Sequence, residues 1–210
     1  MPRRSQEDRS RTTRAALEDA GRRLFAERGY ANVSAEEIVS AAGVTRGALH
    51  HHYGDKRGLF LAVLELVEAD ATAEVTRAIE ALSATTDASD PTATLAAMGV
   101  GLQTFLEVCQ RPEVARISMS DAPAVLGWPA WREMEARYGL GLIISQLEQA
   151  REAGLIADAP IRVLAQLILS AVTEAGMIVA HAEDQPTARA EAQQSLMTLI
   201  SGLIHPPETP

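Results

Sequence analysis

Apolar residues recur three and four positions apart along most of the chain, which is the spacing of one face of an α-helix. Alternating runs of Val, Ile and Thr between tight-turn dipeptides, which would indicate β-strands, are not found in the sequence. The pattern therefore predicts an all-α protein. Breaks at glycine and proline predict helices over about 13–28, 35–42 and 45–52, a long fourth helix from about 55, a linker over 83–92, and helices over about 92–110, 112–121, 129–153, 159–183 and 186–204.

Helix-start and helix-stop signals are clearest in the first 60 residues. Ser34 is followed three positions later by Glu37, which is the capping-box pattern of a helix N-terminus. Gly29 and Gly43 stand where the first and second helices should end, because glycine adopts the left-handed conformation common at that position. Asp55 is a favourable N-cap for the long fourth helix.

The segment 34–59 combines two short helices with a glycine-centred turn that is too tight for the helices to lie antiparallel. This arrangement is typical of a helix-turn-helix. Its apolar positions, where the helices must contact each other and the first helix, are Ile38, Ala42, Val44 and Leu49. The outward face is left to Arg46, His50 and His51, on a helix short enough to enter the major groove of B-DNA. The segment therefore predicts a DNA-reading element.

The same segment carries an ordered set of residues: Ile38, Val39, Ala42, Gly43, Val44, Thr45, Gly47, Leu49, His50, His52, Tyr53, Lys56 and Leu59. This order resembles the TetR family of bacterial transcriptional regulators over about residues 10–60. Three residues depart from the family pattern, since Val39 replaces a small alanine, His50 a tyrosine and Tyr53 a phenylalanine. The rest of the chain is compatible with the family's length and helical fold but has no diagnostic motif.

The resemblance implies the residues that face DNA. They are Ser34, Thr45, Arg46, the backbone of Gly47, His50, His51, His52 and Lys56. The Arg46 guanidinium has the geometry to pair with both acceptors of guanine, and Lys56 is expected at a phosphate near a helix N-terminus. Three consecutive histidines project about 100° apart on a helix, so they cannot converge on one ion. We therefore expect no metal site and no cofactor.

Charge is distributed unevenly along the 210 residues, whose formal net charge is -9. Residues 1–60 carry eleven Arg and Lys against eight Asp and Glu, so the front of the chain is basic although the whole is acidic. We predict a DNA-binding domain over 1–58, with a flexible basic arm over 1–10, and a larger helical domain over 59–210 for effector binding and dimerisation. The single cysteine, Cys109, excludes an intramolecular disulfide and is expected to be buried. The charged start and the absence of 18 consecutive apolar residues predict a cytoplasmic protein without a membrane span.

The C-terminal helices have wide apolar surfaces. The apolar residues of the first of these helices are Val163, Leu164, Leu167, Ile168, Ala171, Val172, Ala175, Ile178 and Val179, and those of the second are Leu196, Leu199, Ile200 and Leu203. The resemblance implies that helices 160–183 and 186–204 pair with their symmetry mates in a homodimer, whereas the alternative is that both stripes face the core of their own protomer. A homodimer would read a palindromic operator, because one reading helix covers one half-site.

The resemblance also implies a small effector among the middle helices. The candidate lining residues are Phe105, Met119, Trp128, Trp131, Met134, Tyr138, Glu174 and Met177. Because polar groups are few among them, a largely apolar effector is favoured. Ordinary helix packing explains the same residues, so a helical DNA-binding or protein-interaction module without an effector is the alternative function. No nucleophile elbow, phosphate-binding loop or dinucleotide motif is found in the sequence, and we expect no enzyme activity and no catalytic residues.

Overall fold

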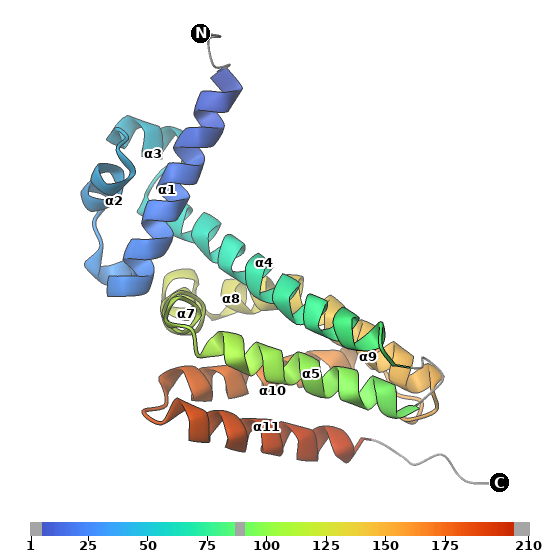
Figure 1. The fold of residues 1–210 in the computed structure, drawn as a ribbon. Coiled ribbons are helices and arrows are strands. Elements are labelled where there is room, and N and C mark those ends of the chain that lie inside the picture. Colours follow the sequence, from blue (N-terminus) through green and yellow to red (C-terminus); the bar gives the residue numbers. More distant parts are fainter. Residues whose placement is uncertain (1–5, 87–90, 204–210) are drawn as a thin grey trace, which may run out of the picture. The chain divides into compact units, whose positions relative to one another are not determined.

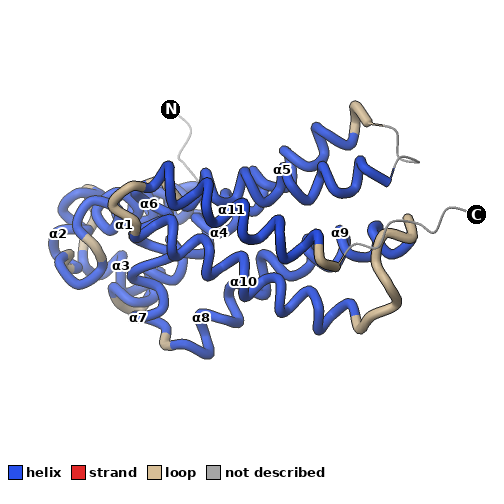
Figure 2. Tube along the Cα trace, turned by 90° about the horizontal axis from the view of Figure 1, so that it is seen from below, coloured by secondary structure: helices blue, strands red, loops and turns tan. Residues whose placement is uncertain are grey.

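The computed structural model describes residues 6–86 and 91–203, which form helices joined by short loops (Figure 2). The α-helices are α1 (Gln6–Arg28), α2 (Ala35–Ala42), α3 (Arg46–Tyr53), α4 (Lys56–Ser83), α5 (Pro91–Cys109), α6 (Pro112–Val114), α7 (Ala122–Leu126), α8 (Trp128–Glu135), α9 (Gly141–Glu152), α10 (Ile161–His181) and α11 (Gln185–Ser201). A 3-10 turn, η1 (Tyr30–Asn32), precedes α2, and two π-helical segments, η2 (Ala115–Asp121) and η3 (Ala136–Leu140), continue α6 and α8. The predicted all-α class is confirmed.

Contacts divide the chain into two compact units. The first comprises residues 1–67 together with 112–125, and the second comprises 68–111 together with 126–210. The division falls inside α4, whereas the sequence suggested a boundary between residues 58 and 59. Helix α1 begins at Gln6, two turns before the predicted start, so residues 6–10 of the predicted flexible arm are helical. Residues 1–5 of that arm and residues 87–90 of the predicted linker lie outside the described residues.

The predicted caps are present in the first unit. The Ser34 hydroxyl accepts from the Glu37 amide, and the Glu37 carboxylate accepts from the Ser34 amide, which completes the capping box. Gly43 closes α2 in the left-handed conformation with φ of 65°. The Asp55 carboxylate accepts from the Gly58 amide at 2.8 Å and so caps α4. Each cap provides a partner for a helix-end amide or fixes the helix end, which explains why local sequence defines these helices well.

Helices α1, α2 and α3 and the start of α4 lie together in the first unit (Figure 1). An aromatic and aliphatic core holds them in place. Phe25 and Phe60 are fully buried and pack edge to face with ring centroids 5.3 Å apart. Ile38 of α2 and Leu49 of α3 are also buried, as the helix-turn-helix pattern predicted. Gly21 lets α1 approach α4 closely, because a Cβ there would lie 3.3 Å from both Leu59 and Val63.

The segment 112–125 belongs to the first unit although it is far in sequence from residues 6–67. The Arg22 guanidinium donates two hydrogen bonds to the Glu113 carboxylate, at 2.9 and 2.8 Å. The Tyr30 amide donates to Asp121 at 2.6 Å. These contacts join α1 and the turn before α2 to the segment that contains α6, η2 and α7.

In the second unit, α10 packs against α5, α9 and α11. The η3 segment contains Gly139 and ends just before Gly141, the first residue of α9, and a Cβ at Gly139 would lie 3.0 Å from Leu169 of α10. Cys109 is buried as predicted, and burial raises the pKa of its thiol, with Glu68 adding to the effect.

Candidate nucleic-acid interface

Helix α3 presents a polar face to solvent while its apolar side anchors it to the first unit. The Thr45 hydroxyl accepts from the Ala48 amide and thereby caps the helix N-terminus. Leu49 is buried, whereas Thr45, Arg46, Gly47, His50 and His51 are exposed. A Cβ atom added at Gly47 would have its nearest neighbour, the Thr45 hydroxyl oxygen, 3.8 Å away. The backbone at Gly47 is therefore open to a ligand. Five of the residues predicted to face DNA are therefore accessible to solvent, whereas His52 is half-buried.

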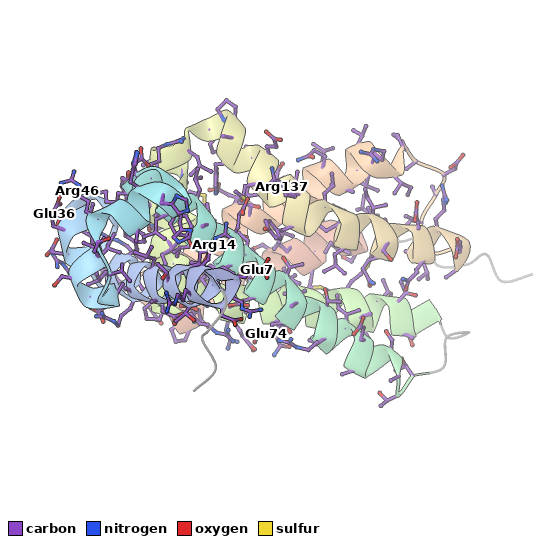
Figure 3. The ribbon with its side chains drawn as sticks, turned by 90° about the horizontal axis from the view of Figure 1, so that it is seen from above. Glu7, Arg14, Glu36, Arg46, Glu74 and Arg137 are labelled. Carbon is purple, nitrogen blue, oxygen red and sulfur yellow. The ribbon has the colours of Figure 1, made fainter. Side chains whose placement is uncertain are left out.

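Arg46 lies beside a carboxylate that the sequence analysis did not single out. Its guanidinium donates to Glu36 of α2 at 2.5 Å, and the two side chains are 76% and 62% exposed (Figure 3). An ion pair this exposed stabilises the fold by at most about 1 kcal/mol. Its geometric effect is larger, because Glu36 restricts where the Arg46 guanidinium points. Glu36 lies in the first turn of α2, and Arg46 lies in the first turn of α3. These two positions are the sequence signal that could have linked the two residues.

The three histidines have different surroundings. His50 Nδ1 lies 2.6 Å from the Gly54 carbonyl oxygen, and if it carries the proton, Nε2 remains free to accept a hydrogen bond. The His51 and His52 rings are 5.0 Å apart. Burial, followed by the neighbouring His51 and Arg14, lowers the pKa of His52. Among the described residues, no group of three His, Cys, Asp or Glu side chains is placed to hold a metal ion.

Lys56 and Ser34 make contacts inside the domain. The Lys56 ammonium donates to the Tyr30 and Val33 carbonyl oxygens at 2.9 and 2.8 Å and lies 4.0 Å from the centroid of the Tyr30 ring. Two of its three N–H groups therefore fix the turn before α2 rather than face solvent. The Ser34 hydroxyl belongs to the capping box, in which the Ser34 amide and hydroxyl, followed by Arg28, hold the pKa of Glu37 at about 2.

The predicted effector-lining residues are only partly brought together. Met119 belongs to the first unit, and the others belong to the second. Trp131 and Met134 are buried and Trp128 stacks near Trp131 with ring centroids 5.1 Å apart, but Trp128 is itself 62% exposed. Phe105, Tyr138 and Met177 are half-buried, while Glu174 is exposed.

A buried ion pair near the tryptophans was not predicted. Arg132 donates to Glu135 at 2.7 Å and to the Ser170 hydroxyl at 2.7 Å. Burial raises the pKa of Glu135, while Thr173 and Arg132 act against that rise. The Oε1 atom of Gln146 is buried without a hydrogen-bond partner. Polar groups outside the predicted effector-lining set are thus present inside the second unit.

Two family models match the chain. One, described as bacterial regulatory proteins of the tetR family, matches residues 17–63. The other, described as a tetracyclin repressor-like C-terminal domain, matches residues 95–203, which is just over half of the chain. The chain therefore belongs to the TetR family of bacterial regulatory proteins, a family of regulators rather than of enzymes.

Individual relatives agree with this assignment. A TetR-family transcriptional regulator from Pectobacterium atrosepticum is 32% identical, with a TM-score of 0.79 over 98% of this chain and 100% of that one. The transcriptional repressor AcnR of Corynebacterium glutamicum is 41% identical over 27% of this chain and 30% of its own length. The regulator AcrR of Shigella flexneri is 45% identical over 28% of this chain and 27% of its own length. The chain thus matches less than a third of the length of these two curated relatives.

Within the part of the chain that the structure describes, two helices are apolar and long enough to cross a membrane by length and composition. They are residues Thr92–Cys109 of α5 and all of α10. Both lie within or overlap the region matched by the C-terminal family model. By themselves, two such helices are weak evidence of a membrane protein, because core helices of soluble proteins have the same length and composition.

Proposed function

We propose that this protein is a transcriptional repressor that binds a palindromic operator as a homodimer. The observation that carries the proposal is the exposed face of α3, on which Arg46, His50 and His51 surround an open backbone position at Gly47. A helix of eight residues fits the major groove, with its N-terminal residues against base edges. The C-terminal half of α3 then faces the bordering phosphates. The AcnR relative bears the name of a repressor, which supports repression over activation.

Within this interface, Arg46 is the residue proposed to read a base. Its guanidinium can donate to O6 and N7 of one guanine, and Glu36 beside it can accept from the N4 amino group of an adjacent cytosine. Ser34 and Thr45 add hydroxyls and first-turn amides near the backbone of DNA. Lys56 fixes the turn before α2 through two carbonyl oxygens and the Tyr30 ring, and we propose that its positive charge attracts a phosphate from that position.

The test replaces Arg46 with alanine. Duplexes that bind the wild type are selected from a random pool, and the selection is repeated with Arg46→Ala. We expect the variant to lose its preference at one base pair in each half-site, at a cost of about 1 to 3 kcal/mol, while it still binds DNA. Arg162→Ala, which removes an exposed arginine on α10, is the control and should leave the consensus unchanged. An unaltered consensus for Arg46→Ala would contradict the assigned role.

We also propose that a small, largely apolar effector in the second unit releases the operator. The support is the buried pair Trp131 and Met134, with the Arg132–Glu135 ion pair available to orient a polar group. An effector that prefers the conformation unable to fit both half-sites lowers operator affinity by its differential binding. A helical module without an effector remains the second candidate, favoured by the exposure of Trp128 and Glu174. We place the protein in the cytoplasm, where its DNA is.

The effector proposal is tested with small aromatic compounds. Compounds that raise the melting temperature are identified first, and operator affinity is then measured with and without saturating compound. We expect a decrease of about 5- to 150-fold for at least one of them. If every compound that binds leaves operator affinity unchanged, the module without an effector is the correct function.

A further inference from the structure

A groove lies on the first unit between the N-terminal turns of α1 and the C-terminal half of α3. Its volume is about 960 Å³, and it is lined by Glu7, Arg9, Ser10, Arg11, Thr13, Arg14, His51 and His52. We name it the α1–α3 groove. Three guanidinium groups, two imidazoles and two hydroxyls face it, against one carboxylate from Glu7. Figure 3 shows Glu7 and Arg14 on α1, apart from the Glu36 and Arg46 pair.

The positive charges of this groove are only partly compensated inside the protein. Arg11 donates to Asp8 one turn earlier, at 2.5 Å, and that pair is exposed to solvent. Arg14 and His51 act together on His52, since each disfavours its protonated form. Cations held close to one another in a hollow favour an anionic ligand, which relieves their repulsion.

The position of the groove indicates which anion it takes. Its α3 residues, His51 and His52, lie toward the opposite end of that helix from Arg46, about 7.5 and about 9 Å along the axis at 1.5 Å per residue. When the N-terminal end of α3 meets base edges, the other end comes to the phosphates that border the major groove. Helix α1 has 23 residues and α3 has eight, and the first turns of α1 project past α3 (Figure 1).

We propose that the α1–α3 groove binds the sugar-phosphate backbone of duplex DNA next to the half-site that α3 reads. This inference rests on the proposed function as a DNA-binding regulator. Arg9 and Arg14 contact phosphates, and Ser10 and Thr13 donate hydroxyl hydrogen bonds to them. The contact adds affinity without reading sequence, because phosphates carry no base information. The site requires helical structure in the N-terminal turns of α1, where the sequence suggested a flexible arm.

The experiment compares two duplexes with the same selected operator. One ends at the outer edges of the half-sites, and the other extends by about ten base pairs of arbitrary sequence on each side, one helical turn of DNA. The wild type is expected to bind the extended duplex at least tenfold more tightly. The double variant Arg9→Ala/Arg14→Ala loses this preference, and the slope of its affinity against salt on the extended duplex decreases by about two to four, as expected for lost phosphate contacts in two protomers.

A matched control removes the same charge elsewhere. Arg23→Ala/Arg137→Ala replaces two exposed arginines outside the groove and should keep the preference for the extended duplex. Equal wild-type affinity for both duplexes, or a preference that survives in Arg9→Ala/Arg14→Ala, would overturn the groove proposal and leave operator recognition intact. Failure of the wild type to bind either duplex would instead overturn the proposed function, and the groove proposal with it.

The pH dependence of duplex binding provides a second test of the groove proposal. The groups that act on or contact His52 are Arg14 of α1 and His51 and Tyr53 of α3, and the charged side chains of Glu7, Arg9 and Arg11 of α1 line the same groove. Because the pKa of His52 is lowered in the free protein and a phosphate in the groove would raise it, binding of the extended duplex takes up a proton. The preference for that duplex is therefore expected to increase as pH falls from about 8 to 6. A wild-type preference that is constant across this pH range would contradict the placement of phosphate beside His52. The same conclusion would follow if the His52→Gln variant kept the pH dependence of the wild type.

Discussion

Replacing Gly58 with alanine is expected to destabilise the first unit by about 3 kcal/mol and to abolish operator binding. A Cβ at this position would lie 1.9 Å from the Tyr53 carbonyl oxygen and 3.0 Å from the Tyr53 carbonyl carbon. These are backbone atoms, so no side-chain rotation can make room. The α3–α4 junction must open, and α3 is then no longer held at the angle that its buried Leu49 defines. Thermal unfolding and operator titration measure the two effects.

Gly47→Ala is the matched control for this prediction. Gly47 is also helical, but a Cβ there would meet no atom closer than 3.8 Å. Alanine is favoured over glycine within a helix by about 1 kcal/mol. The Gly47→Ala variant is therefore expected to be at least as stable as the wild type. If Gly58→Ala proves as stable as Gly47→Ala, the close approach of α3 and α4 is not present in solution.

The second large effect concerns the proposed dimer. Among the described residues, six large apolar side chains are exposed, and four of them lie on the last two helices. Val163, Leu167 and Ile178 recur on one face of α10, and Leu199 lies on α11, which packs beside it. Leu167→Glu/Leu199→Glu is expected to give a folded monomer, because both side chains are 64% exposed in the protomer. Operator affinity should fall by about 10²- to 10⁴-fold, since each half-site is then bound alone.

The control for the dimer variant is Trp128→Glu. It also places a carboxylate at an exposed apolar position, 62% exposed, but on α8 rather than on the last two helices. We expect it to remain dimeric in analytical ultracentrifugation. A dimeric Leu167→Glu/Leu199→Glu variant would place the interface elsewhere and would favour the interpretation in which these helices serve only their own protomer.

Much of the fold follows from local chemistry. The capping box at Ser34 and Glu37, the left-handed Gly43 and the cap at Asp55 each involve residues within a few positions of one another, so their pattern predicts the helix ends. The buried Ile38 and Leu49 follow in the same way from helical spacing. The start of α1 was predicted too late because residues 6–12 are polar and lack the apolar stripe that marks the rest of the helix.

Long-range contacts account for what the sequence could not predict. Arg22 and Glu113 are 91 residues apart, and nothing local relates them or places 112–125 on the first unit. Lys56 was expected at a phosphate from its position at the start of α4, but the Tyr30 and Val33 carbonyls that hold it come from a turn more than 20 residues away. Glu36 and the α1–α3 groove likewise depend on how separate helices meet. The outward residues of a motif can thus be predicted, but their partners require the tertiary structure.

We propose that α3 reads DNA twice in each dimer, and the most direct test is the symmetry of the duplexes that the wild-type protein selects from a random pool at low ionic strength. We expect two inverted half-sites whose centres are separated by one or more helical turns, with protection of both. Recovery of unenriched DNA, or of a single half-site without an inverted partner, would contradict it.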